Sequence, residues 1–174
     1  MHKRKSRHKA AHYRGAHLTA QLSKVVELFL KRLFEPYFIR RGSYGENQYA
    51  YLPGKGARDS LAFLMLRWIE ALCRGAKIAL YCADVAGAFD RVKRERLLQK
   101  LRARGMHAKL IAVVDAWLER RHGKVIVGGA ESHAFDLYNM VFQGTVLGPS
   151  LWNNFYADVA IAVDIIVADD LNCY

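Results

Sequence analysis

The order of apolar and polar residues predicts two long helices in the first half of the chain. In residues 18–36, LTAQLSKVVELFLKRLFEP, apolar residues recur at steps of three and four, and Pro36 is expected to end the helix. Residues 60–75, SLAFLMLRWIEALCRG, repeat the pattern, with Gly75 as a C-terminal cap. The side chains expected to face the core are Leu22, Val25, Val26, Phe29, Leu33 and Phe34 in the first helix and Leu61, Leu64, Met65, Trp68, Ile69 and Leu72 in the second.

The second half of the chain mixes shorter helices with strands. The segments RERLLQKLRARG and HAKLIAVVDAWLERRHG have helical periodicity and are expected to end at Gly105 and Gly123. KVIVGGAESHAFDLYNMV predicts two strands around a turn that contains two glycines. Pro149 suits the first turn of a helix that continues through Val163. Because helices and strands do not alternate regularly, the sequence predicts an α+β fold.

Two short apolar runs end in aspartate. Residues 78–83 form a nearly continuous apolar run, which is typical of a strand buried on both faces, and Asp84 follows it. Residues 165–168 predict a second strand, followed by Asp169 and Asp170. If these strands pair in one sheet, three carboxylates meet at one edge, where their mutual repulsion requires cations. Hard oxygen ligands favour Mg²⁺ or Mn²⁺, and two such ions would assist an in-line phosphoryl displacement.

Each aspartate also has an ordinary structural explanation. Asp84 can begin a turn or cap a helix, and Asp169 and Asp170 can be a solvated segment. The overall charge indicates a polyanionic partner, because the chain of 174 residues carries 27 Lys and Arg against 16 Asp and Glu, a net charge of +11. Such a protein suits a polyanionic partner, and an acidic metal centre within it suits a nucleic acid with triphosphate monomers.

The composition argues against several other classes of protein. Cys73, Cys82 and Cys173 form no closely spaced pair, so we expect neither a zinc site nor a disulfide framework. The chain has no apolar run that could span a bilayer and no secretion signal. We therefore expect no membrane partner and an intracellular location, in the nucleus or the cytoplasm. The sequence indicates no oligomeric state.

The chain begins with a strongly basic segment. Residues 1–14, MHKRKSRHKAAHYR, contain six lysines and arginines and no acidic residue. This segment is a solvated tail, a nuclear-import signal or a phosphate-contacting element. We divide the chain into a basic N-terminal arm, residues 1–12, and one domain, residues 13–174.

Five motifs, in one order, resemble those of reverse transcriptases, especially the enzymes of non-LTR retrotransposons. DVAGAFD at 84–90 resembles the first catalytic motif, QGTVLGP at 143–149 resembles the Gln-Gly…Leu-Gly-Pro motif, and ADD at 168–170 resembles the end of the aromatic-x-Asp-Asp box. Upstream, YRGAHL at 13–18 resembles the Arg-Pro-Ile-Ser-Leu element. QYAYLPGKGARD at 48–59 resembles the family's Gln-x-Gly-Phe-Arg-Pro-Gly-Arg-Gly-x-x-Asp segment.

The resemblance implies a right-hand polymerase architecture. Fingers and palm would occupy residues 13–174, with the palm strands and motifs mainly in 77–92 and 142–174. Because only LNCY follows the acidic pair, the resemblance also implies a palm that is incomplete at its C-terminus and a chain without the thumb. The implied reaction is RNA-directed DNA synthesis, in which a primer 3′-hydroxyl attacks a dNTP. Its cofactor would be Mg²⁺ or Mn²⁺, and its partners an RNA template and a DNA primer.

The same resemblance implies roles for individual residues. The catalytic and metal-binding positions would be Asp84, Val85 through its backbone carbonyl, Asp169 and Asp170. The nucleotide-binding positions would be Arg14, Phe89, Gln143 and Gly144, with Phe89 excluding a 2′-hydroxyl by shape. Lys55 and Arg58, in a Gly-rich basic loop, would contact the nucleic-acid backbone. Without the resemblance, Phe89 is an ordinary core residue and the loop is a plain surface loop.

The sequence also departs from the family pattern. Val167 stands where the family has an aromatic residue, and Ala50 replaces a glycine. The chain between Gln143 and Asp169 is shorter than the family pattern, so a helix through Val163 would leave almost nothing for the turn into residues 165–168. We therefore expect the acidic pair to be displaced from Asp84.

Two other functions compete with a polymerase. One is a catalytically inactive, nucleic-acid-binding remnant, which the net charge and the missing thumb favour. The other is a different palm-type nucleotidyl transferase or cyclase, against which the QGTVLGP segment argues.

Overall fold

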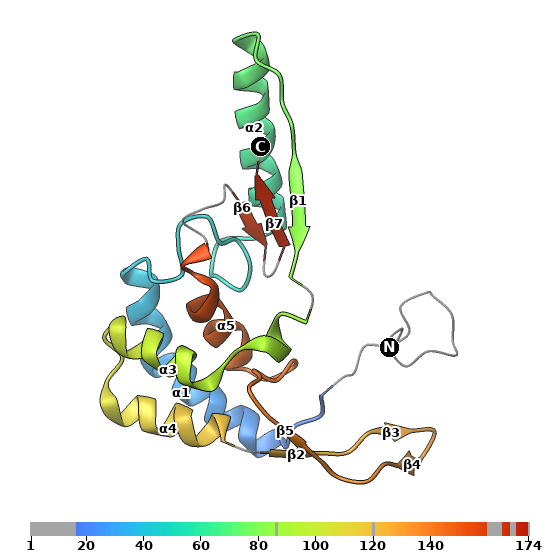
Figure 1. Cartoon of the computed structure of the whole chain (residues 1–174). Coiled ribbons are helices and arrows are strands. Elements are labelled where there is room, and N and C mark those ends of the chain that lie inside the picture. The colour runs from blue at the N-terminus through green and yellow to red at the C-terminus, as the bar shows by residue number, and fades with distance from the viewer. Residues whose placement is uncertain (1–16, 86, 120, 160–164, 168–169, 174) are drawn as a thin grey trace.

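A computed structural model describes residues 17–159, except 86 and 120, together with residues 165–167 and 170–173. In these residues, helices and small antiparallel sheets are mixed, in agreement with the predicted α+β class (Figure 1). The elements are α1 (Gln21–Arg40), α2 (Ala57–Cys73), β1 (Tyr81–Asp84), a 3₁₀ turn (Phe89–Arg91), α3 (Arg94–Ala103), α4 (Ala108–Leu118), β2 (Arg121–Gly123), β3 (Ile126–Val127), β4 (Ala130–Glu131), β5 (Phe135–Leu137), α5 (Gly148–Tyr156), β6 (Ile165–Val167) and β7 (Asp170–Cys173).

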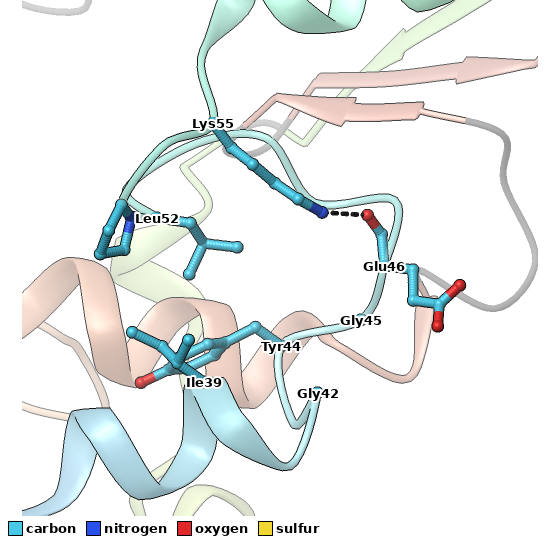
Figure 2. Close-up of a pocket in the computed structure, with 8 residues that line it drawn as sticks. Ile39, Gly42, Tyr44, Gly45, Glu46, Leu52 and Lys55 are labelled. Atoms are coloured by element: carbon cyan, nitrogen blue, oxygen red, sulfur yellow. Dashed lines mark hydrogen bonds between the residues drawn. The ribbon is translucent and has the colours of Figure 1, made fainter.

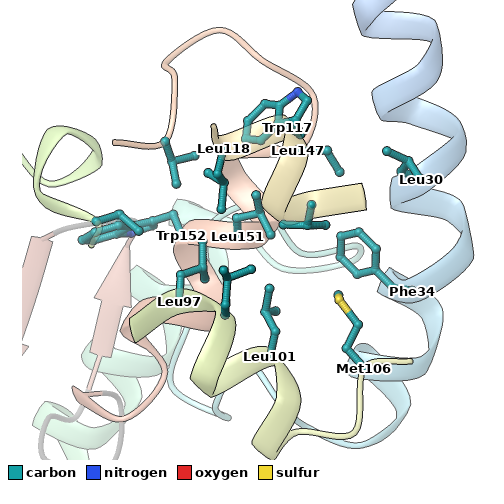
Figure 3. Packing of buried hydrophobic residues seen from close by; sticks show 14 of the residues in the cluster. Leu30, Phe34, Leu97, Leu101, Met106, Trp117, Leu118, Leu147, Leu151 and Trp152 are labelled. Carbon is teal, nitrogen blue, oxygen red and sulfur yellow. The ribbon is translucent and has the colours of Figure 1, made fainter. Parts of the chain in front are cut away.

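Helix α5 lies at the centre of the main core. Its Leu151 is fully buried and its Trp152 is 2% exposed, with side chains of α1, α3 and α4 around them (Figure 3). Trp152 stacks between Phe89 and Tyr156, with ring centroids 5.5 Å and 4.7 Å apart. The surrounding helices and the connection between α3 and α4 contribute Leu30, Phe34, Leu97, Leu101, Met106, Trp117 and Leu118.

The C-terminal end of α5 is held by two cations, one in α3 and one just after it. Lys100 donates a hydrogen bond to the carbonyl of Phe155, and Arg104 donates one to the carbonyl of Asn154. Both cations also pair with Asp158, at 2.6 Å and 2.9 Å. Cations at the last carbonyl groups of a helix satisfy acceptors that have no partner within the helix and complement its dipole. Helix α5 ends at Tyr156, so the prediction that it continues through Val163 was wrong.

The two aspartate-terminated strands belong to one sheet, but they are not neighbours in it. The strand order is β1-β7-β6, so the returning strand β7 lies between them and is antiparallel to both. The predicted burial of the first strand on both faces was wrong. Tyr81 is 69% exposed and Leu80, just before β1, is 45% exposed. Helix α2 stands beside this small sheet (Figure 1). Ile165 of β6 is fully buried, so the exposure of β1 does not extend to every described residue of the sheet.

Helix α1 buries a different face from the one predicted. Leu30, Phe34 and Phe38 are the apolar residues that it buries, whereas most of the predicted face, including Phe29, is exposed. The helix carries two apolar stripes, and periodicity alone cannot say which of them meets the core. The expectation that Pro36 ends the helix was also wrong. Pro36 lies inside α1, between two phenylalanines that are anchored in the core.

Helix α2 ends as predicted but is largely exposed. Gly75 follows its last turn with a φ of +76°, and the amide of Ala76 donates to the carbonyl of Ala71, a C-terminal cap of the kind expected. Leu64 is the one residue of the predicted apolar face that is buried. None of the helices in the described part of the chain is long and apolar enough to cross a membrane.

A hairpin extends from the helical body (Figure 1). Strand β2 pairs with β5, and β3 pairs with β4 around Gly128 and Gly129, as the two glycines predicted. Helix α4 ends at Leu118 and not at Gly123, which is the last residue of β2. The glycine that looked like a helix cap therefore belongs to the base of the hairpin, where a Cβ atom would lie 3.1 Å from Leu137 Cδ1.

The face that α1 buries can be tested with two matched substitutions. Phe38 is fully buried and Phe29 is 64% exposed on the same helix. We expect Phe38→Ala to lower the free energy of unfolding by about 3–5 kcal/mol, because it removes core contacts and leaves a cavity. Phe29→Ala should change it by less than about 1 kcal/mol. Urea unfolding followed by circular dichroism measures both. Equal losses for the two variants would contradict the orientation of α1.

Candidate functional site

The backbone brings the first and last acidic motifs together. Asp84 is the last residue of β1, and its Cα partner across the antiparallel ladder is Asp170, the first residue of β7. Opposed residues in such a ladder have Cα atoms about 4.5–5.5 Å apart. Asp84 is exposed, and its carboxylate provides hard oxygen ligands of the kind that divalent cations prefer. The register therefore fits a cation at this end of the sheet.

We expected the acidic pair to be displaced from Asp84, but Asp170 lies directly opposite Asp84 in the ladder. Because α5 ends at Tyr156, residues 157–164 connect it to β6, and this length suffices for the chain to enter the sheet. Asp169 and Arg14, two of the predicted site residues, lie outside the described residues. Among the described side chains, no group of three or more His, Cys, Asp or Glu residues is placed to hold a metal ion.

A backbone hydrogen bond joins the DVAGAFD segment to the residues just before the QGTVLGP segment. The amide of Val141 donates to the carbonyl of Phe89 at 2.9 Å, two residues before Gln143. The Phe89 ring is 8% exposed and stacks on Trp152, so it packs as a core residue. Val85 is partly buried against the same core. The structure thus brings the segment that follows Asp84 next to the residues that precede Gln143.

Gln143 and Gly144 form an exposed turn just before α5. Gly144 has a φ of +80°, in the left-handed region that favours glycine. A Cβ atom at this position would lie 3.3 Å from the backbone carbonyl oxygen of His17. The turn therefore packs closely against the segment that precedes α1, and it presents backbone and a polar side chain to solvent.

A buried glutamate, which the sequence analysis missed, holds this turn in place. Glu27 of α1 is 0% exposed, and its Oε2 accepts hydrogen bonds from the amides of Val146 at 2.7 Å and Leu147 at 3.2 Å. Ser23 Oγ donates to its Oε1 at 2.9 Å. These amides lie at the start of α5, where backbone donors lack helical partners and negative charge is favourable. The sequence did contain a signal for this role. Glu27 lies one helical turn before Leu30, on the same face of α1 as Leu30 and Phe34.

One arginine lies near this buried carboxylate. The guanidinium of Arg121 stacks over Trp117 and Phe142, 5.0 Å and 4.8 Å from the ring centroids. The pKa of Arg121 is lowered from its ordinary value, because the effect of burial exceeds the opposing effect of the negative charge of Glu27. The base of the hairpin therefore places a fixed cation close to the QGTVLGP segment.

The two residues predicted to contact nucleic acid, Lys55 and Arg58, are not part of this turn. Lys55 lies in the loop between α1 and α2, and Arg58 lies in the first turn of α2. Lys55 donates a hydrogen bond to the carbonyl of Glu46 and lies 5.1 Å from the centroid of the Tyr49 ring, so it closes its own loop (Figure 2). Arg58 is exposed in the first turn of α2. A cavity of about 170 Å³ lies under the loop, beside Tyr44, whose pKa is raised by burial.

Comparison with known proteins identifies relatives along nearly the whole chain. A family model described as "Reverse transcriptase (RNA-dependent DNA polymerase)" matches residues 2–173. The chain is similar to "RNA-directed DNA polymerase from mobile element jockey" of Drosophila melanogaster, with 29% identity over 159 residues, which is 91% of this chain and 17% of that protein. It is also similar to "Probable RNA-directed DNA polymerase from transposon BS" of the same species, with 26% identity over 147 residues, 84% of this chain and 16% of that protein.

A third relative is covered to the same extent as the polymerase of transposon BS. It is the jockey polymerase of Drosophila funebris, with 28% identity over 148 residues, 84% of this chain and 16% of that protein. The chain therefore spans about a sixth of the length of the curated relatives that it matches.

The contribution of Glu27 can be measured against another helical glutamate. We expect Glu27→Ala to lower the free energy of unfolding by about 2–4 kcal/mol, because two buried amides lose their acceptor. Glu70→Ala, which removes a half-exposed glutamate of α2, should change it by less than about 1 kcal/mol. Denaturant unfolding gives both values. Hydrogen exchange at Val146 and Leu147 should accelerate in Glu27→Ala alone, and unchanged protection there would contradict the assigned contacts.

Proposed function

This chain belongs to the reverse transcriptase family, of the non-LTR retrotransposon type. We propose that it forms the fingers and most of the palm of an RNA-directed DNA polymerase. The palm would comprise the β1-β7-β6 sheet and α5, and its motifs would lie mainly in residues 77–92 and 142–174. Residues 13–76 would contribute chiefly to the fingers, after a basic arm at residues 1–12. The observation that carries this proposal is the register that opposes Asp84 to Asp170.

The proposed catalytic residues are Asp84, Asp169 and Asp170. Together with the backbone carbonyl of Val85, they would hold Mg²⁺ or Mn²⁺. When bound, a pair of such ions would favour attack by the primer 3′-hydroxyl on a dNTP and stabilise the charge that develops on the leaving pyrophosphate. The exposed position of Asp84 leaves its carboxylate accessible to both metal and substrate.

The remaining roles follow the positions of the motifs. The Gln143–Gly144 turn would lie against the incoming nucleotide and the template, where the absence of a Cβ permits close approach to the backbone. Phe89 would select the deoxyribose through the small exposed part of its ring, while its stacking on Trp152 anchors it in the core. Arg14 would contact the triphosphate of the nucleotide. Lys55 and Arg58 would contact the backbone of the nucleic acid, and the hydrogen bond from Lys55 to Glu46 would order that loop.

A second function draws support from one specific observation. The net charge of +11 suits sequence-independent binding of nucleic acid, which needs no acidic centre. Under this alternative the chain would be an inactive, nucleic-acid-binding remnant of a retroelement polymerase. Its binding would fall steeply with salt and would be indifferent to Mg²⁺ and to Asp84→Asn.

Primer extension on an RNA template distinguishes the two functions. With Mg²⁺ and dNTPs, we expect extension by the wild-type chain and a loss of at least about 100-fold for Asp84→Asn, since a metal ligand contributes several kcal/mol to transition-state stabilisation. Asp169→Ala should show a similar loss. Asp90→Asn, which changes the exposed aspartate at the other end of the same motif, should retain activity.

The outcomes separate activity from ancestry. Wild-type protein that binds RNA but extends no primer would support the remnant and remove the catalytic proposal for this chain. Extension that survives both Asp84→Asn and Asp169→Ala would remove the proposed metal site.

A further inference from the structure

An apolar stripe runs along the outer side of α1 and is left largely exposed by the described part of the chain. Leu30 and Phe34 point from α1 into the core (Figure 3), so side chains on the opposite side of the helix face away from it. Phe29 is 64% exposed there, and its neighbours at steps of three and four residues are also more than half exposed. Apolar residues at this spacing form the face that a helix normally buries. The stripe consists of Leu22, Val25, Val26, Phe29 and Leu33.

The stripe has the dimensions of a docking surface for a helix. From Leu22 to Leu33 it extends for about 17 Å along α1. A contiguous row of exposed apolar side chains on a soluble protein marks a site of interaction. When helices recognise apolar surfaces, they use anchors at positions i, i+3, i+4 and i+7. The spacing and length of the stripe therefore fit the apolar face of a second helix.

The exposed charges along the stripe are positive. Arg32 follows Phe29 by three residues and Arg40 follows Leu33 by seven, so both lie along the stripe, and both are exposed. Among the described residues, no carboxylate forms an ion pair with either arginine. These two guanidinium groups are therefore available to an acidic partner.

Both glutamates of α1 are turned away from this surface. Glu27 is fully buried, and its carboxylate accepts from the amides at the start of α5. Glu35 accepts a hydrogen bond from Ser150 Oγ and pairs with Lys31 at 3.3 Å. The outer surface of α1 is thus apolar and cationic. Its electrostatic complement is an apolar surface with acidic residues along its edges.

We propose that the outer stripe of α1 binds an amphipathic helix of a partner protein, whose apolar face is flanked by glutamate or aspartate. The inference goes beyond the proposed polymerase function, because the stripe lies on the side of α1 opposite to Glu27, which holds the Gln143–Gly144 turn. A second copy of the chain fits less well, since it would bring two cationic stripes together. Nucleic acid would pair with the arginines but leave the apolar side chains in water.

Two synthetic peptides test the apolar and the electrostatic parts of this proposal. Both form amphipathic helices of about five turns with a leucine face, and they differ in having glutamates or lysines along its edges. Fluorescence anisotropy measures the affinity of each labelled peptide for the whole chain. We expect the glutamate peptide to bind more tightly than the lysine peptide. The Arg32→Glu variant should reverse this order, because like charges across an interface repel.

A matched pair of exposed apolar residues locates the contact. Phe29→Gln should weaken binding of the glutamate peptide by at least about 10-fold, because large apolar side chains at the centre of an interface contribute most of its affinity. Leu66→Gln, which changes a residue of α2 that is 68% exposed, should leave the affinity unchanged. Circular dichroism should show the same helix content for both variants. Equal affinities of wild type and Phe29→Gln, or no saturable binding of the glutamate peptide by wild type, would overturn the proposal.

Further arms test the other occupants of the stripe. Sedimentation without peptide measures self-association, and a dimer that Phe29→Gln dissociates would assign the stripe to a second copy and overturn the proposal. Vesicles of phosphatidylcholine and phosphatidylserine test a membrane surface, and labelled oligouridylate tests RNA. Binding to either that is lost in Phe29→Gln would also overturn it. All of these measurements contain neither Mg²⁺ nor dNTP, so their results are independent of whether the chain extends a primer.

Discussion

Helix α5 is held at both ends by charges from other helices, and the rest of the structure depends on this arrangement. At its start, the carboxylate of Glu27 accepts from two backbone amides, and at its end Lys100 and Arg104 donate to the last carbonyl groups. Both ends satisfy groups that a helix leaves unpaired, and both charges oppose the helix dipole. A buried carboxylate is costly without partners, and here Ser23 provides a third hydrogen bond. The most buried helix of the body is therefore located by polar contacts and not by apolar packing alone.

The candidate site is assembled around this helix from segments that are distant in sequence. Before α5, the Gln143–Gly144 turn is placed by Glu27 on one side and by the hydrogen bond from Val141 to Phe89 on the other. After α5, the early end at Tyr156 leaves residues for the chain to reach β6 and return as β7. The return strand then opposes Asp84 to Asp170. Under the proposed function, the position of α5 thus links the nucleotide turn to the metal-binding end of the sheet.

Acidic and basic features lie on different parts of this framework. Asp84 stands at the end of the exposed strand β1, whereas a basic cleft with Arg121, His122 and Lys124 lies between the start of α1 and the base of the hairpin. The turn at Gly144 lies against one wall of that cleft. Under the proposed function, a metal centre at the sheet would handle the reacting groups while a separate cationic surface would hold the polymer.

The sequence by itself determined the order of the elements, the C-terminal cap of α2 and the chemistry of the acidic strands. The cap at Gly75, the turn at Gly128–Gly129 and the Asp-terminated strands all follow from local rules, because turns, caps and strand periodicity depend on neighbouring residues. Only the tertiary structure decided which stripe of α1 is buried, where α5 ends and that β7 separates β1 from β6. Those outcomes rest on contacts between residues far apart in the chain, such as Glu27 with Val146 and Lys100 with Phe155, which no local pattern encodes.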